Sequence, residues 1–204
     1  VWAIYGHGNV AGLGEALAHH RRQLPVLRAH NEQAMAHAAI AFGKATFRRR
    51  IMAATTSIGP GATNLLTAAA LAHVNRLPVL LLPGDVFASR EPDPVLQQVE
   101  DFGAGDISAN DAFRPLVRYF DRITRPEQIL DALPRAVQVM TDPALCGPVC
   151  LALPQDVQTM AFDCPASFLS PPVLRIRRPA PDARELAAAA EALRQARRPL
   201  LVAG

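Results

Sequence analysis

The apolar run at residues 77–82 (Leu-Pro-Val-Leu-Leu-Leu) restricts the fold of this chain more than any other stretch. Apolar and polar residues do not alternate in this run, so a strand made from it needs cover on both faces. Strands of this kind are typical of parallel sheets that carry helices on both faces. Pro83, Gly84 and Asp85 follow the run, and these turn-forming residues predict that the strand ends there.

Other short apolar runs repeat this unit of strand, turn and helix. Further strands are expected at residues 1–5, 25–29, 50–56 and 147–157, and the strand at 25–29 is expected to be buried. Helical patterns cover residues 14–23, 31–42, 62–73 and 126–140, and Pro134 in the last of these predicts a kink or a second helix. Residues 86–125 show no clear period, which predicts a long irregular region. The repeat predicts an α/β fold with a doubly wound, mostly parallel sheet flanked by helices.

The C-terminal residues differ in composition from this repeat. Four prolines between positions 171 and 181 predict a linker at residues 166–181, after a first domain at residues 1–165. An alanine-rich helix at 183–198 and a strand with a glycine turn at 199–204 then suggest that a second α/β domain begins at 182–204. The sequence starts and stops directly at predicted strands, so we expect it to be the N-terminal piece of a longer protein.

Composition excludes several classes of protein. The residues are 50% hydrophobic and 19% charged with a net charge of +3, which suits a well-buried core. Arg48, Arg49 and Arg50 form the densest basic cluster, but only 5% of residues are aromatic, so nucleic-acid binding is not expected. No stretch approaches the ~18 apolar residues of a membrane span, and no targeting segment opens the chain, so we expect a cytoplasmic protein without membrane contact. The three cysteines are expected to be small buried side chains rather than metal ligands.

The stretch from His30 to His37 (His-Asn-Glu-Gln-Ala-Met-Ala-His) is the first candidate for a functional site. Asn31 is a good N-cap residue for the helix that follows, which places Glu32 in the first helical turn. That turn follows a predicted strand, and open α/β sheets bind ligands at the carboxyl ends of their strands. Glu32 could equally be an acid that the helix dipole favours.

The stretch at residues 56–66 is the second candidate, with the order Ser-Ile-Gly-Pro-Gly-Ala-Thr-Asn at 57–64. Pro60 fixes one φ angle, and Gly59 and Gly61 let backbone amides approach a ligand closely. The P-loop sequence Gly-Lys-Ser/Thr is not present here, so triphosphate binding is disfavoured. Together the two stretches resemble the pyrimidine-binding domain of thiamine-diphosphate enzymes of the acetolactate-synthase-like group, whose second motif has no counterpart of Ile58.

This resemblance implies a cofactor and a set of residues that bind it. It implies thiamine diphosphate, with Glu32 as the catalytic carboxylate on the aminopyrimidine ring and Gly59, Pro60, Gly61 and Asn64 as further cofactor contacts. In the family a Gly-Asp-Gly…Asn motif of a later domain holds the diphosphate and Mg²⁺. This sequence has no Gly-Asp-Gly, so the Mg²⁺ ligands are expected outside it. The resemblance also implies a homodimer or homotetramer through the pyrimidine/diphosphate domain interface.

The loop after the first strand is expected to line the substrate side of the pocket. His7 could be a polar contact or proton carrier there and Asn9 a hydrogen-bond partner, although a turn histidine and an Asx turn are equally compatible with the sequence. Gln97 or Gln98 matches the family's active-site glutamine loosely. Gly6, Gly8 and Gly12 miss the G-x-G-x-x-G spacing, which disfavours a nicotinamide-binding domain.

Segments at residues 6–12, 75–85, 94–98 and 107–116 resemble one branch of the family more specifically. That branch hydrolyses a C–C bond of a cyclic dione, a small-molecule substrate that only the resemblance supplies. Two alternatives stay open. The chain could belong to an acetolactate-synthase-like 2-oxo acid decarboxylase or carboligase, or it could be a non-catalytic module of the same fold that acts in assembly.

Overall fold

The computed structural model describes residues 1–90, 95–101, 103–170, 173–176 and 179–202. These fall into two compact units, Val1–Leu174 and Arg175–Gly204.

The second unit contains helix α6 (Ala183–Gln195), where the Asp182 carboxylate caps the first turn by accepting from the backbone N–H groups of Arg184 and Glu185. Residues 199–202 form no strand, because a strand needs a neighbour to complete its hydrogen bonds. The turn expected at 203–204 lies outside the described residues, and the domain boundaries at 165 and 182 stay predictions.

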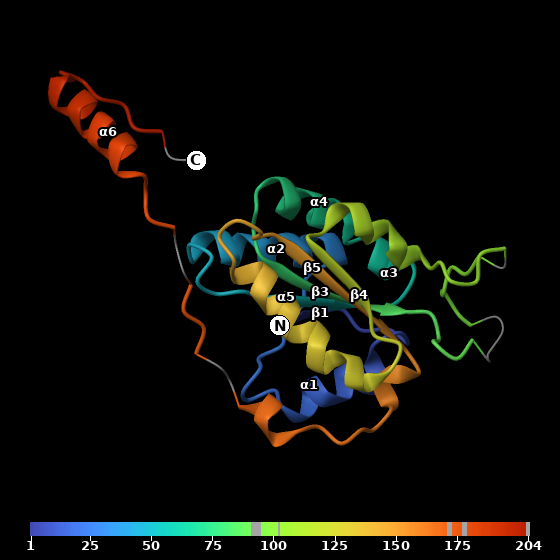
Figure 1. The fold of residues 1–204 in the computed structure, drawn as a ribbon. Helices are drawn as coiled ribbons and strands as arrows, with labels where there is room; N and C mark the ends of the chain where they lie inside the picture. The colour runs from blue at the N-terminus through green and yellow to red at the C-terminus, as the bar shows by residue number, and fades with distance from the viewer. Residues whose placement is uncertain (91–94, 102, 171–172, 177–178, 203–204) are drawn as a thin grey trace. The chain divides into compact units, whose positions relative to one another are not determined.

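The first unit is built on a parallel sheet of five strands in the order β1-β2-β3-β5-β4 (Figure 1). The strands are β1 (Trp2–Ala3), β2 (Ala53–Thr56), β3 (Val79–Asp85), β4 (Tyr119–Arg122) and β5 (Pro148–Pro154). Every neighbouring pair is parallel, and β3 pairs with β2 on one side and with β5 on the other. The doubly wound parallel sheet predicted from the sequence is therefore confirmed.

Helices cover both faces of this sheet (Figure 1). On one face lie α2 (Glu32–Ala45), α3 (Pro60–Thr63) and α4 (Leu66–Val74), and on the other lie α1 (Glu15–His19) and α5 (Ile129–Thr141). A π-helical turn, η1 (Val10–Gly14), leads into α1. Short 3₁₀ segments are η2 (Ala109–Leu116), η3 (Pro126–Gln128), η4 (Val157–Thr159) and η5 (Ala166–Leu169). None of the helices among the described residues has both the length and the apolar character that crossing a membrane requires.

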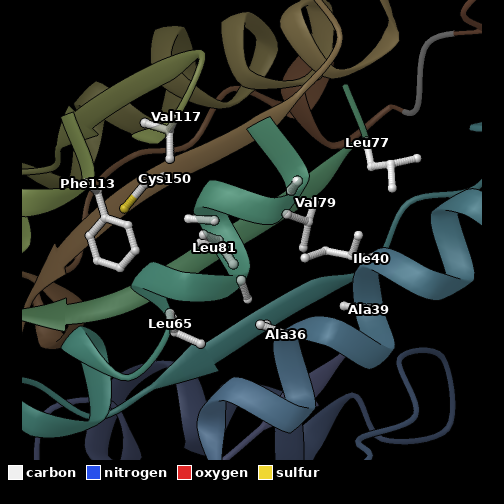
Figure 2. Close-up of a cluster of buried hydrophobic side chains, with 14 of the residues drawn as sticks. Ala36, Ala39, Ile40, Leu65, Leu77, Val79, Leu81, Phe113, Val117 and Cys150 are labelled. Carbon is white, nitrogen blue, oxygen red and sulfur yellow. The ribbon is translucent and has the colours of Figure 1, made fainter. Parts of the chain in front are cut away.

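Strand β3 explains why its sequence is apolar throughout. Val79 and Leu81 are fully buried against α2 and α4, in the core shown in Figure 2. Leu80 and Leu82 point to the opposite face and pack in the core that contains α5. Burying a side chain of this size stabilises a fold by about 1.5–3 kcal/mol, so both faces of β3 contribute.

Two predictions about strands were wrong in position. The expected buried strand at 25–29 is a single parallel bridge between Leu27 and Trp2, and Leu27 is 43% exposed. It lies beyond β1 at the outer margin of the sheet, where no further strand of the described residues pairs with it. Strand β3 does not end before Pro83 but continues to Asp85. Proline has no N–H to donate, yet pairing with β5 resumes at Gly84, opposite Leu153.

Three further expectations need correction. The region 86–125 is not irregular throughout, because it contains η2 and the edge strand β4. Helix α5 continues through Pro134, so the second helix offered as one alternative does not start there, while the kink stays a prediction; the buried Ala132, Ala136 and Met140 hold α5 against the sheet. The first helix ends at His19 rather than at residue 23.

Candidate active site

The sheet topology creates a crevice at the carboxyl end of β1. From β1 the chain crosses one face through α1 to the margin at Leu27, and then crosses the other face through α2 to β2. Connections that leave neighbouring strands on opposite faces open a cleft at the strand ends, where α/β proteins bind ligands. Tyr5 and Gly6 after β1 and Glu32 at the start of α2 line a pocket of about 410 Å³ at this point.

Glu32 takes its position from the cap of α2. The Asn31 Oδ1 atom accepts a hydrogen bond from the Ala34 backbone N–H at 2.8 Å, so the predicted N-cap is confirmed. Glu32 is then the first helical residue and is half-buried. Its Oε2 atom accepts a hydrogen bond of 2.8 Å from the side-chain amide of Asn64. The carboxylate is thus tied to the end of α3. An acid that only served the dipole of α2 would not need this hydrogen bond.

The Gly-Pro-Gly turn brings the second motif to this carboxylate. Gly59 has φ +62°, a left-handed conformation that favours glycine, and a Cβ there would overlap the carbonyl oxygen of Gln97. Pro60 is the first residue of α3. A Cβ on Gly61 would lie 3.5 Å from Oε1 of Glu32, so the glycine leaves the space beside that oxygen open.

Asn9 forms its hydrogen bonds with the first loop and with β2. Its amide nitrogen donates to the Ile4 carbonyl at 3.2 Å and to the Thr55 hydroxyl at 3.1 Å, and its Oδ1 atom accepts from the Gly6 N–H at 3.0 Å. The side chain is only 2% exposed and does not line the pocket around Glu32. Asn9 therefore ties the loop to β2.

The additional residue Ile58 packs beneath the same loop. It is 2% exposed, and a Cβ on Gly8 would lie 2.6 Å from its backbone nitrogen. The hydroxyl of Ser57 accepts a hydrogen bond from the Gly8 N–H at 3.2 Å. Residues 57 and 58 thus fix the backbone of the loop that carries His7.

The remaining candidates divide between the pocket and its surroundings. Gln97 lines the pocket together with Glu32, Pro60, Gly61 and Asn64, whereas His7, Asn9, Gln98 and Gly59 do not line it. The Nε2 atoms of His7 and Gln98 are both buried and find no hydrogen-bond partner among the described residues. Gln98 is held at its other end, where Oε1 accepts from the Phe87 N–H at 3.2 Å.

Among the pocket residues that were not singled out from the sequence, two carry a hydroxyl group. Tyr5 and Ser57 both line the pocket, and burial raises the pKa of the Tyr5 phenol. Ser57 follows directly after the strand expected at 50–56, and Tyr5 is the last residue of the strand expected at 1–5, so their places at carboxyl strand ends were the signal that could have found them.

A buried charge cluster beside the site was also not foreseen. Arg122 on β4 donates from Nε to Asp85 at 2.7 Å and from one terminal nitrogen to Asp111 at 2.6 Å and to the Ser108 hydroxyl at 2.9 Å. Asp85 is 1% exposed. Burial alone would raise the pKa of Asp111, but the hydrogen bonds from Ser108, Arg114 and Arg122 and the charge of Arg122 outweigh it and lower that pKa.

The described residues contain no group of three or more His, Cys, Asp or Glu side chains that could hold a metal ion. The three cysteines are free, and Cys146 and Cys150 are buried. Burial raises the pKa of both buried thiols, that of Cys150 strongly. They therefore pack as small apolar side chains at neutral pH.

The chain belongs to the thiamine pyrophosphate enzyme family, since residues 1–104 match its N-terminal TPP binding domain. Its relatives include the 3D-(3,5/4)-trihydroxycyclohexane-1,2-dione hydrolases of Geobacillus thermodenitrificans, Bacillus velezensis and Bacillus licheniformis, which are 52%, 51% and 50% identical to it. Each comparison covers 204 residues, which is all of this chain and 32% of the relative. The chain thus spans about a third of the length of these relatives, and the family resemblance read from the sequence is confirmed.

Proposed function

We propose that this chain is the pyrimidine-binding part of a thiamine-diphosphate-dependent hydrolase that cleaves a C–C bond of trihydroxycyclohexane-1,2-dione. The expected product is 5-deoxy-glucuronate, and the reaction would belong to inositol catabolism. The observation that carries the proposal is the pocket in which Glu32 and Asn64 meet across two helices. The identity of 50–52% to hydrolases of this name supports the choice of substrate.

The residues of the pocket fit an aminopyrimidine ring. A ring of this kind needs a carboxylate beside one nitrogen and room for a flat group, and the pocket offers the Glu32 carboxylate and the side-chain-free Gly61. When bound, thiamine diphosphate supplies a carbon nucleophile that attacks a carbonyl group. Glu32 would accept a hydrogen bond from the ring and thereby set its protonation state. Asn64 holds one oxygen of that carboxylate in place.

Three further parts of the proposal concern the whole protein. Mg²⁺ and the diphosphate group would be held by residues outside this chain. The protein would be a homodimer or homotetramer in which a partner subunit closes the pocket. We place it in the cytoplasm.

Replacing Glu32 by Gln tests the proposed chemistry. In the full-length protein that contains this chain, Glu32→Gln should lower turnover at least about 10²-fold, the effect of losing a positioned proton-transfer group. Glu15→Gln is a matched control, because Glu15 is also the first residue of a helix and is exposed. If the helix dipole were the whole role of Glu32, both variants would behave alike. Turnover of Glu32→Gln within threefold of the unmodified protein would contradict the mechanism.

Substrate assays separate the proposed function from its alternatives. The protein should consume the cyclic dione in the presence of thiamine diphosphate and Mg²⁺ and should leave pyruvate unchanged. Consumption of pyruvate instead would indicate a 2-oxo acid decarboxylase or carboligase. If calorimetric titration detected no binding of thiamine diphosphate, the chain would be a non-catalytic module and the proposal would be wrong.

A further inference from the structure

The turn after β5 contacts two loops that flank the candidate site. Val157 in this turn is 5% exposed and packs in the core that contains α5. The Gln155 N–H donates to the carbonyl of Asp85 at 3.2 Å. The backbone of the turn is therefore fixed to the sheet, so side chains that leave it can hold other segments in place.

Gln158 holds the loop after β1. Its Nε2 atom donates to the carbonyl oxygens of Gly8 and Leu153, both at 2.8 Å, and its Oε1 atom accepts from the Leu13 N–H at 3.3 Å. Gly12 packs so closely on Gln158 that a Cβ at position 12 would overlap it. One side chain thus ties the loop, from the residue after His7 to the start of α1, to the end of β5.

Asp156 holds the loop after β3. Its Oδ1 atom accepts from the Ala88 N–H at 2.9 Å and its Oδ2 atom from the Ser89 N–H at 3.0 Å. The adjacent Phe87 N–H donates to Oε1 of Gln98, so the segment that Asp156 fixes also carries the hydrogen bond that orients Gln98. A charged acceptor forms stronger hydrogen bonds than a neutral one, which suits a loop without regular structure.

The end of strand β3 also contacts the loop after β1. A Cβ on Gly84, near the end of β3, would lie 2.5 Å from the carbonyl oxygen of Gly8, so the two backbones touch. Gly8 is therefore held on three sides, by Gly84, by the Ser57 hydroxyl and by Gln158.

We infer that Asp156 and Gln158 are positioning residues, which set the loops carrying His7 and Gln98 relative to the Glu32 pocket. The inference rests on the proposed function, because positioning matters only if a substrate reacts there. Displacements of about 1 Å in a site can cost up to 10²-fold in rate. Loss of either tether should therefore lower kcat/KM for the dione and leave the affinity for thiamine diphosphate nearly unchanged, because neither residue touches the pocket around Glu32.

Hydrogen–deuterium exchange in the full-length protein tests the tethers without any activity assay. Gln158→Met keeps the length of the side chain but removes its hydrogen bonds, and should speed exchange at residues 8–14 while leaving residues 86–90 unchanged. Asp156→Asn should speed exchange at residues 86–90 and leave residues 8–14 unchanged, because the new amide group cannot accept hydrogen bonds from both loop N–H groups. Gln138→Met on α5 is the control, since Gln138 is exposed and should alter exchange in neither loop.

Kinetics on the same variants test positioning. We expect kcat/KM for the dione to fall at least about tenfold in Gln158→Met and in Asp156→Asn, with the Kd of thiamine diphosphate changed less than about threefold. Faster loop exchange with unchanged kcat/KM would overturn the inference, and so would reduced kcat/KM without faster exchange. Failure of the unmodified protein to bind thiamine diphosphate would instead refute the proposed function. Unchanged exchange in both variants would refute the tethers, whether or not the cofactor binds.

Discussion

Removing Arg122 should destabilise the first unit far more than removing a neighbouring arginine. Arg122 pairs with two carboxylates, and its side chain is 17% exposed, whereas that of Asp85 is 1% exposed. In Arg122→Met the Asp85 charge stays buried and loses its ion-pair partner, although it keeps the hydrogen bond from the Val86 N–H at 2.8 Å. Breaking a buried ion pair in this way typically costs about 3–5 kcal/mol of unfolding free energy.

Arg114→Met is the matched control, because Arg114 pairs with the same Asp111 but its side chain is 57% exposed. Its loss removes an exposed ion pair and the stacking of its guanidinium on Phe120 at 4.4 Å, together worth about 1–2 kcal/mol. Chemical denaturation of the 204-residue chain at pH 7, followed by the fluorescence of its single tryptophan, measures both values.

A second substitution tests the cause. Asp85→Asn in the Arg122→Met background removes the charge that would be left alone. The double variant should therefore lose at least about 1 kcal/mol less unfolding free energy than the two single variants lose in sum. Equal losses in Arg122→Met and Arg114→Met would refute the reasoning, because they would mean that water compensates the Asp85 charge.

Three shorter predictions follow from other features. The pKa of Asp111 is lowered from 3.8 in the folded state. Its contribution to stability is therefore complete above 3.8 and is lost as the pH falls through the lower folded-state pKa. Asp111→Asn should flatten this part of the acid denaturation curve. In the native protein at pH 7 a maleimide should label Cys164 well before the fully buried Cys150, and equal rates of labelling would contradict the packing. Gly84→Ala should lower stability by about 1–3 kcal/mol in denaturation, because the new methyl group displaces the backbone of Gly8.

The position of the pocket could be predicted from the sequence because it follows from the order of strands and turns. Glu32 and Asn64 are 32 residues apart, but Asn64 follows the parallel strand β2 and Glu32 follows the parallel bridge at Leu27, and the carboxyl ends of such segments meet at one edge. The N-cap at Asn31 is a local preference and was equally readable. Local rules and topology together were enough to place these residues.

Strand β4 and the tethers could not be predicted because they depend on distant partners. Tyr119–Arg122 is a four-residue strand with two charged residues, and the half-buried Arg122 is favourable there because it pairs with Asp85, 37 positions earlier, and with Asp111. Gln158 and Gly8 are 150 positions apart. The run at 25–29 misled for a related reason, since an apolar run gives no sign that its strand will lie at the margin of the sheet.

The strand order has a consequence for biosynthesis. Strand β5 is the last to be made, yet it lies between β3 and β4. On the ribosome one side of β3 therefore has no partner while the next roughly 60 residues are added, a delay of roughly 3–12 s at ordinary elongation rates. During that interval an open, highly apolar strand is available to other nascent chains, so we expect the synthesis of this unit to depend on chaperones more than its final stability would suggest.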